Sequence, residues 1–305
     1  MEQNRTLIIS TVAALLILTA LGAVLISTSS LPSFSTNISA SSGTVKTIPV
    51  SGAISSSSSG GFLASASLSS GDIAEAIREA NRDSSVDAIL LKINSPGGAP
   101  VASHEIVRAV DSVDKPIAAQ IRETGASGAY WVASATDHIT ADPVSITGSV
   151  GVTASYLQYS GLLERYNITY QQVTAGEYKE LASPFTNLTS DEAALLEEKI
   201  TRIGDYFLED VVANRDITPA DREQIETGVW FTGLESRDVG LVDSLGGEDR
   251  AVQYLENQTN KSLSVADASF ERSFFQQLSG VTISTGTALF DNILRSETKT
   301  RPQLR

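Results

Sequence analysis

The fold is decided by residues 86–121, VDAILLKINSPGGAPVASHEIVRAVDSVDKPIAAQI. Residues 86–93 form a nearly continuous apolar run, which is typical of a strand buried on both faces. The run ends in the turn sequence NSPGG, and apolar residues at helical spacing over 101–113 then predict a helix. A second apolar run at 117–121 predicts another strand. This order of strand, helix and strand indicates parallel strands joined by a crossover helix.

The same alternation continues on both sides of this stretch and predicts an α/β fold. A strand at 45–50 and a helix at 72–83 come before it. After it, the sequence predicts a helix from the GASG sequence to about residue 135, a strand at 138–141 and a loop at 147–151. Thr189 and Glu192 form a capping-box pattern at the start of a long amphipathic helix. The apolar stripe of that helix consists of Leu196, Ile200, Ile203, Phe207 and Val211.

The N-terminus predicts a membrane anchor. Residues 6–26, TLIISTVAALLILTALGAVLI, carry no charge and have the length that a helix needs to cross a bilayer. A cleaved signal peptide is the alternative, but its apolar stretch is normally shorter. We therefore expect four parts: a cytoplasmic stub with a single transmembrane helix (1–28), a Ser-rich linker (29–44), an extracytoplasmic body (45–258) and a C-terminal extension (259–305).

Composition excludes several kinds of chemistry. The 305 residues include no Cys and only two His, which removes disulfides, thiolate nucleophiles and His-rich metal sites. A net charge of -14 argues against a nucleic-acid partner. We expect no metal and no cofactor. The acidic, Lys-poor composition suits a protein from a high-salt environment, although an ordinary acidic secreted domain would look similar.

Three glycine-rich spots could carry chemistry. Residues 95–98, SPGG, follow a buried strand and could aim backbone N–H groups at a ligand, or could simply form a tight turn. Ser127, in GASG, could be an accessible nucleophile at a helix start or an N-cap residue. Residues 147–151, TGSVG, place a second small hydroxyl, Ser149, in a loop.

A nucleophilic serine needs a base, and the residues alone leave the choice open. His104 and His138 cannot be placed beside Ser127 from the sequence. A lysine can accept a proton when burial favours its neutral form. Lys92 interrupts a core strand, where it could equally pair with an acid, and Lys179 lies in a segment that mixes glycine, aromatic and apolar residues.

Five motifs in order resemble the signal peptide peptidases of serine peptidase family S49. They are NSPGG (94–98), GASGAYW (125–131), TGSVGV (147–152), EYKELASPF (177–185) and GLVDSLGG (240–247). The resemblance implies a crotonase/ClpP-like spiral of ββα units and a Ser/Lys dyad, with Ser127 as nucleophile and Lys179 as general base. It also implies that Ser149 orients the lysine and that the Gly98 N–H is an oxyanion-hole donor.

Local sequence adds further expectations to the resemblance. We also expect the N–H of Gly128 to be a second oxyanion-hole donor, because it lies at the start of the predicted helix. Lys92 stands where the family usually has an arginine, which favours a structural role. Gly128-Ala129 replaces the family's Gly-Gly. Short family members with one copy of the dyad form rings, so the resemblance implies a homo-oligomer.

The expected function is therefore a membrane-anchored serine endopeptidase that hydrolyses peptides, in particular signal-peptide remnants. One alternative is a membrane Ser/Lys protease of the type linked to NfeD and stomatin proteins. Another is an inactive or acyl-CoA-handling protein on the crotonase-like fold. The extension at 259–305 could dock on the acidic body, helping assembly or covering the active-site groove, or could be a loosely packed tail.

Overall fold

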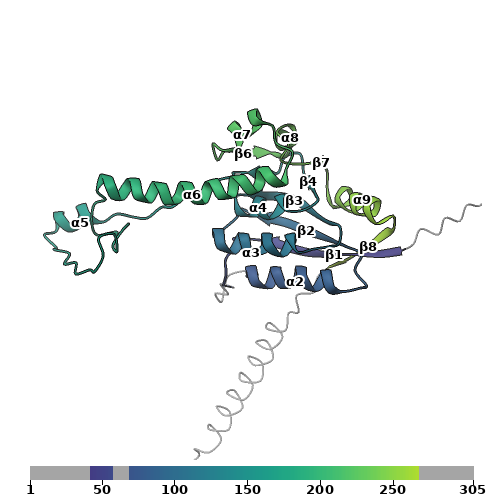
Figure 1. The fold of residues 1–305 in the computed structure, drawn as a ribbon, viewed down its shortest axis with the longest axis horizontal. Coiled ribbons are helices and arrows are strands. Elements are labelled where there is room, and N and C mark those ends of the chain that lie inside the picture. Colours follow the sequence, from purple (N-terminus) through teal and green to yellow (C-terminus); the bar gives the residue numbers. More distant parts are fainter. Residues whose placement is uncertain (1–41, 58–68, 268–305) are drawn as a thin grey trace, which may run out of the picture. The chain divides into compact units, whose positions relative to one another are not determined.

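A computed structural model of the protein describes residues 42–57 and 69–267. Its elements alternate between strand and helix in the first half of this region (Figure 1). In chain order they are β1 (Ser42–Ser51), α2 (Ser70–Arg82), β2 (Ala88–Ser95), α3 (Pro100–Asp111), β3 (Ile117–Ala126), α4 (Gly128–Ser134), β4 (His138–Ala141), β5 (Ile146–Gly148), α5 (Ser160–Arg165), α6 (Ser190–Asn214), α7 (Pro219–Ile225), β6 (Trp230–Thr232), α8 (Gly233–Asp238), β7 (Ser244–Leu245), α9 (Glu248–Thr259) and β8 (Ser262–Asp267).

The described strands form one sheet in the order β6-β5-β3-β2-β1-β8, in which every pairing except β5 with β6 is parallel. The sheet forks at β3. Residues Ala118 to Ile121 of β3 pair with β4, whereas Thr124 to Ala126 pair with β5. β7 extends the β4 branch. The fork opens the sheet beside the carboxyl end of β3, where the GASG sequence begins.

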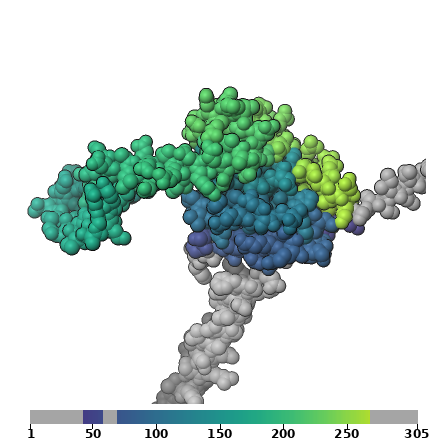
Figure 2. Space-filling view, viewed as in Figure 1, coloured from purple at the N-terminus to yellow at the C-terminus, as the bar shows by residue number. Residues whose placement is uncertain are grey.

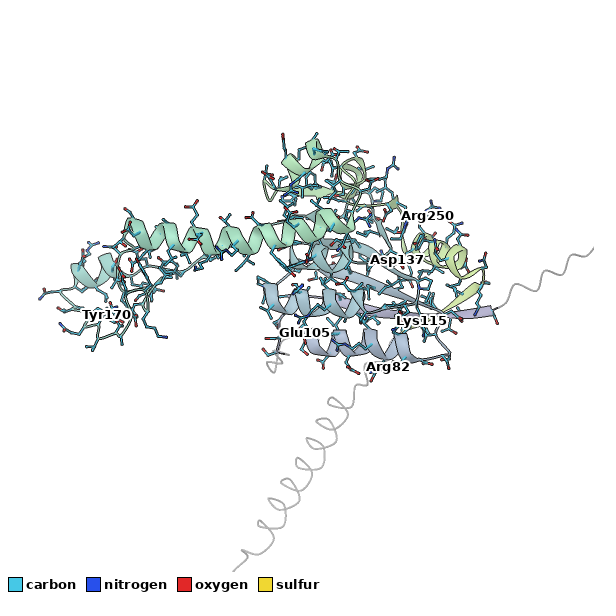
Figure 3. All side chains as sticks on the ribbon, in the orientation of Figure 1. Arg82, Glu105, Lys115, Asp137, Tyr170 and Arg250 are labelled. Carbon is cyan, nitrogen blue, oxygen red and sulfur yellow. The ribbon has the colours of Figure 1, made fainter. Side chains whose placement is uncertain are left out.

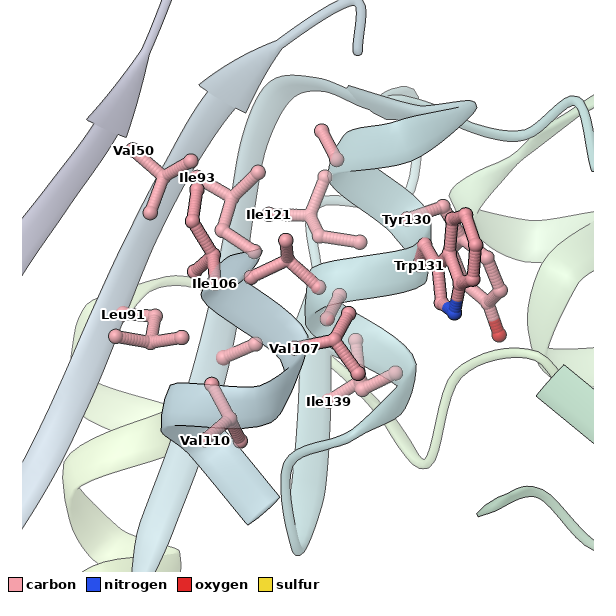
Figure 4. Packing of buried hydrophobic residues seen from close by; sticks show 14 of the residues in the cluster. Val50, Leu91, Ile93, Ile106, Val107, Val110, Ile121, Tyr130, Trp131 and Ile139 are labelled. Carbon is pink, nitrogen blue, oxygen red and sulfur yellow. The ribbon is translucent and has the colours of Figure 1, made fainter. Parts of the chain in front are cut away.

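Alternating residues of the central strands divide the core between the two faces of the sheet. Ile89, Leu91 and Ile93 of β2 belong to a large cluster that includes α2, α3 and α4 (Figure 4). Ala88 and Leu90 point to the other face, where Leu255 of α9 covers them. Helices on both faces explain why this strand is apolar at almost every position.

The helix α6 begins with the predicted capping box. The Thr189 side chain accepts the Glu192 N–H, and the Glu192 carboxylate accepts the Thr189 N–H. Only Phe207, Leu208 and Val211, in the second half of α6, are buried. The predicted apolar stripe therefore reaches the core at its C-terminal end, and Ile203 remains at the surface.

Residues 154–199, which we call the arm, comprise α5, the segment after it and the start of α6. Only Ser160 and Ser183 are buried among them. Figure 2 shows that these residues have little cover from the sheet and its helices. Exposed apolar side chains are frequent here: Tyr156, Leu157, Tyr159, Leu162, Tyr166, Ile168, Tyr170, Val173, Tyr178 and Phe185.

The predicted alternation of strands and helices is confirmed from β1 to β4, with ends that shift by a few residues. The predicted loop at 147–151 differs, because its first two residues belong to strand β5. The sheet also extends past the predicted boundary at residue 258, since β8 pairs with β1. Among residues 42–57 and 69–267, no helix is long and apolar enough to cross a membrane. The predicted span at 6–26 and most of the extension lie outside the described residues.

Candidate active site

Ser127 occupies a sharp turn between strand β3 and helix α4. Its backbone angles, φ 52° and ψ −131°, lie outside the regions that a non-glycine residue normally adopts. Such a conformation costs of order 1–3 kcal/mol and is typical of functional sites. Ser127 stands at the N-cap position, but its side chain makes no capping hydrogen bond. Its hydroxyl is therefore free to act on a ligand.

The turn at 95–98 lies directly against Ser127. Ser95 Oγ accepts the Gly97 N–H at 3.1 Å, and Gly97 has φ 98°. A Cβ atom at Gly97 would lie 2.8 Å from Gly128 N and 2.9 Å from the Ser127 Cβ, so only glycine allows this approach. Ile54 holds the turn from the other side, because its N–H donates to Gly97 O and its carbonyl accepts the Ala99 N–H, both at 2.9 Å.

Two backbone N–H groups remain unpaired at this junction. Among the hydrogen bonds of the described residues, neither the Gly98 N–H nor the Gly128 N–H has an acceptor. Gly128 is the first residue of α4, where an N–H has no partner within its own helix. Both glycines line the same cavity as Ser127. The two predicted oxyanion-hole donors thus lie together beside Ser127.

Ser149 lies next to Ser127 because of the strand register. Ala126 pairs with Gly148, and the Ser127 N–H donates to Gly148 O at 2.8 Å. Ser149 follows Gly148 directly, also has φ 52°, and donates its N–H to Val229 O at 3.1 Å. Both serines face one cavity of about 710 Å³.

The cavity is lined by apolar and charged side chains. The apolar side chains, which we call the apolar wall, are Trp131, Val150, Val152, Ile200, Phe207 and Leu208, and the charged ones are Asp205, Arg222 and Glu226. The Trp131 ring stacks on that of Phe207, with centroids 4.6 Å apart, and its Nε1–H donates to Asp210 at 3.0 Å. Both rings are almost completely buried, so this stack packs rigidly behind the cavity.

Lys179 is not in this cavity. None of residues 154–199 lines it, and the Lys179 side chain is exposed in the arm. The neighbouring Glu180 accepts a hydrogen bond from Tyr170 within the same arm, and Figure 3 labels Tyr170 at the α5 end of α6. The structure of the single chain therefore brings Ser127, Ser149, Gly98 and Gly128 together and leaves Lys179 apart.

The alternative bases belong to structural clusters. His138 begins β4 and pairs with Ala118, nine residues before Ser127, which corresponds to roughly 30 Å along the strand. Its ring stacks on Tyr254, and its Nε2 lies 2.9 Å from Ser244 Oγ. Burial lowers the pKa of His138, although the nearby Asp243 acts in the opposite direction. Its position excludes it as the base for Ser127 of the same chain, and the contacts with Tyr254 and Ser244 hold its ring in a structural cluster.

His104 and Lys92 also have other partners. The His104 ring stacks on that of Trp131, with centroids 5.2 Å apart, and its Nε2 lies 3.2 Å from the Tyr206 hydroxyl. Lys92 forms an ion pair with Glu248 at 2.7 Å, which confirms the structural role predicted for it.

Comparison with known proteins identifies the family. A family model described as peptidase family S49 matches residues 109–262, just over half of the chain. The chain belongs to peptidase family S49. The S49 match includes Ser127, Gly128, Ser149 and Lys179, whereas Gly98 lies before its first residue.

Individual relatives with protease names agree with this assignment. The chain is 35% identical over 183 residues to a putative protease of Methanocaldococcus jannaschii, covering 59% of each chain. It is 30% identical to a putative signal peptide peptidase SppA of Enterococcus faecium, over 60% of this chain and 54% of the relative. Protease 4 of Haemophilus influenzae is 30% identical over 70% of this chain and 35% of the relative. The chain thus spans between a third and three fifths of the length of these relatives.

Sequence reasoning missed several residues around this S49 site. Trp131 follows Ser127 by four residues, one helical turn, so its spacing could have placed it beside the nucleophile. Ile200 and Phe207 were expected only as part of an apolar helix face. Arg222 and Glu226 line the cavity from α7 and the residue after it, and nothing in the local sequence marks them.

Proposed function

We propose that the chain is a serine endopeptidase in which Ser127 attacks the carbonyl carbon of a peptide bond. The observation that carries this proposal is the strained turn at Ser127, whose free hydroxyl lies beside two unpaired N–H groups. A tetrahedral intermediate needs such a pair of donors for its oxyanion, and removing one typically costs about 10²–10³ in kcat.

The chemical steps follow from the groups present. Ser127 Oγ bonds to the carbonyl carbon while a neutral lysine, Lys179, takes the hydroxyl proton. The Gly98 and Gly128 N–H groups hold the oxyanion. When the intermediate collapses, the C–N bond breaks and the lysine returns the proton to the leaving amine. Water then hydrolyses the acyl-enzyme by the same route, and the Ser149 hydroxyl orients the lysine.

Lys179 of a second copy of the chain completes the site in this proposal. Within one chain, Lys179 lies in the arm and the cavity has no lysine in its lining. The exposed apolar side chains of the arm give a second copy a surface to bury, and burial there would also favour the neutral form of a lysine. The homo-oligomer expected from the sequence therefore has a catalytic reason.

The proposal also covers the fold type, the membrane anchor and the substrates. The fold is a crotonase/ClpP-like spiral, residues 6–26 anchor the chain in the cell membrane, and the catalytic domain is extracytoplasmic. The substrates are peptides, in particular signal-peptide remnants. The apolar wall of the cavity supports apolar substrate residues beside the scissile bond.

Mixing two inactive variants tests the proposal. Ser127→Ala and Lys179→Ala should each abolish hydrolysis of a small peptide ester, and Ser127→Ala should also abolish labelling by a serine-reactive phosphonate. Co-assembly of the two variants should restore about a quarter of the wild-type rate, because one random pair of subunits in four joins an intact Ser127 to an intact Lys179. Lys199→Ala, which removes an exposed lysine from α6 in the same arm, is the matched control and should keep full activity.

Each part of the proposal has its own contrary outcome. Full activity of Ser127→Ala would contradict the peptidase mechanism. If both single variants are inactive and mixing them does not restore activity, a second subunit does not supply Lys179 to the site. A Lys179→Ala variant as active as the wild type would contradict the lysine base.

A further inference from the structure

A buried hydroxyl behind the site has no hydrogen-bond partner. Ser103, the fourth residue of α3, is completely buried, and its Oγ makes no hydrogen bond with any described residue. An unpaired hydroxyl in the interior costs about 1–3 kcal/mol. A helical serine often bonds to the carbonyl four residues earlier, but here Ala99 O accepts only the Ser103 backbone N–H. The fold alone therefore gives no reason for a hydroxyl at this position.

The hydroxyl lies against Gly128. A Cβ atom placed at Gly128 would be 2.1 Å from Ser103 Oγ, 2.9 Å from Ser103 Cβ and 3.5 Å from Gly98 N. Ser103, Gly128 and the Gly98 N–H thus meet at one point. Ser103 also explains why residue 128 is a glycine, since a side chain there would collide with the hydroxyl.

The two unpaired N–H groups lie on different segments of the chain. Gly98 comes just before α3, and Gly128 begins α4. Their separation therefore depends on how closely the first turns of these two helices approach. An oxyanion must lie about 2.7–3.1 Å from each donor, so a small change in this separation weakens both hydrogen bonds.

We infer that Ser103 is a positioning residue of the oxyanion hole. Its hydroxyl rests on the Cα of Gly128 and holds the start of α3, with the Gly98 N–H, at a fixed distance from the start of α4. Alanine at 103 would leave a void between the segments, and threonine would add a methyl group to a space that is already full. The inference rests on the proposed peptidase activity of Ser127.

Ser103→Ala tests the inference when compared with Ser236→Ala. Ser236 lies on α8, is also completely buried and also has an unpaired Oγ, but it does not line the cavity. Both variants should unfold close to the wild-type temperature, because the loss of an unpaired polar group offsets the cost of the small void that each substitution leaves. With a small peptide ester, Ser103→Ala should lose at least about tenfold in kcat with KM changed less than about twofold, as expected for an interaction made in the transition state. Ser236→Ala should keep the wild-type kcat.

A rescue experiment tests the contact itself. Gly128→Ala should lose most activity because its Cβ collides with Ser103. In the double variant Ser103→Gly/Gly128→Ala, both Ser103 atoms that collide are absent, so kcat should recover at least about tenfold relative to Gly128→Ala. A double variant whose kcat is the same as that of Gly128→Ala would overturn the inference.

The outcomes separate this inference from the proposed function. If Ser127→Ala is inactive while Ser103→Ala has a kcat within about twofold of the wild type, the positioning role is wrong and the peptidase proposal stands. If Ser127→Ala is as active as the wild type, both are wrong. A KM effect alone in Ser103→Ala would also overturn the inference, since a displaced oxyanion donor acts on kcat.

Discussion

Gly98→Ala is the substitution whose effect the structure specifies most closely. A Cβ atom at Gly98 would lie 1.9 Å from Ile54 O and 2.6 Å from both the carbonyl carbon and the nitrogen of Ile54. These are backbone atoms, which cannot rotate away as the end of a side chain can. An ordinary contact begins at 3.4 Å, so Gly98 and Ile54 must separate by about 1.5 Å.

This displacement should lower both the free energy of unfolding and kcat. The hydrogen bonds from Ile54 N to Gly97 O and from Ala99 N to Ile54 O would break, which should lower the free energy of unfolding by about 1–3 kcal/mol in total. A displacement of this size is about three times the roughly 0.5 Å range of N–H···O hydrogen-bond lengths, so the Gly98 N–H would no longer reach the oxyanion and kcat should fall by about 10²–10³.

The assay combines denaturant unfolding with steady-state hydrolysis of a small peptide ester. Gly71→Ala in α2 is the control, because the atom closest to a Cβ there is Ser69 Oγ at 3.7 Å. It should fold normally and keep full activity. A stable Gly98→Ala variant with a kcat within about threefold of the wild type would refute the assignment of the Gly98 N–H to the oxyanion hole.

Three further predictions concern the cavity wall, an ion pair and pH. Trp131→Phe keeps an aromatic ring against Phe207 but removes the hydrogen-bond donor to Asp210. In steady-state kinetics it should raise KM for apolar peptides several-fold, and in urea unfolding it should lower the free energy of unfolding by about 1–2 kcal/mol. An unchanged KM would count against the apolar wall as a substrate surface. Lys92→Ala should lower that free energy by at most about 1 kcal/mol and leave kcat unchanged, because both side chains of the pair with Glu248 are partly exposed; a loss of activity would contradict its structural role. Burial lowers the pKa of His138 below its usual value of 6.5, so the unfolded chain binds the proton more readily than the folded one. The free energy of unfolding should therefore be constant above about pH 6.5 and decrease as the pH falls below it. In urea titrations His138→Gln should lose less stability over the same pH range, and an identical pH dependence would refute this origin.

Local sequence patterns are sufficient to predict the elements around Ser127. The apolar run at 86–93 predicts β2 because a strand covered on both faces needs apolar residues at almost every position. The pair Thr189 and Glu192 predicts the start of α6 because both partners of the capping box lie within four residues. The GASG sequence marks Ser127 because a strand-to-helix turn this tight requires small residues.

Other features depend on contacts that no local pattern contains. The fork at β3 arises because β4 and β5 pair with different halves of one strand, and this depends on register rather than composition. Ser103 is an ordinary helical serine in the sequence, and only its contact with Gly128 distinguishes it. The periodicity of α6 predicts an apolar face at Ile200 and Ile203 as well as at Phe207, but it does not indicate which part of that face this chain covers.

The uncovered part of that face and the incomplete site have a common explanation. A helix with an apolar stripe needs a surface to cover it, and only the second half of α6 is buried, where Phe207 stacks on Trp131 of α4. The mechanism proposed for Ser127 needs a base, and Lys179 lies in the arm, which also includes the uncovered start of α6. Association of two copies through the arm would bury the stripe and could bring a lysine to the neighbouring cavity in the same step. In the proposed mechanism catalysis would then depend on assembly, and an isolated chain would be inactive.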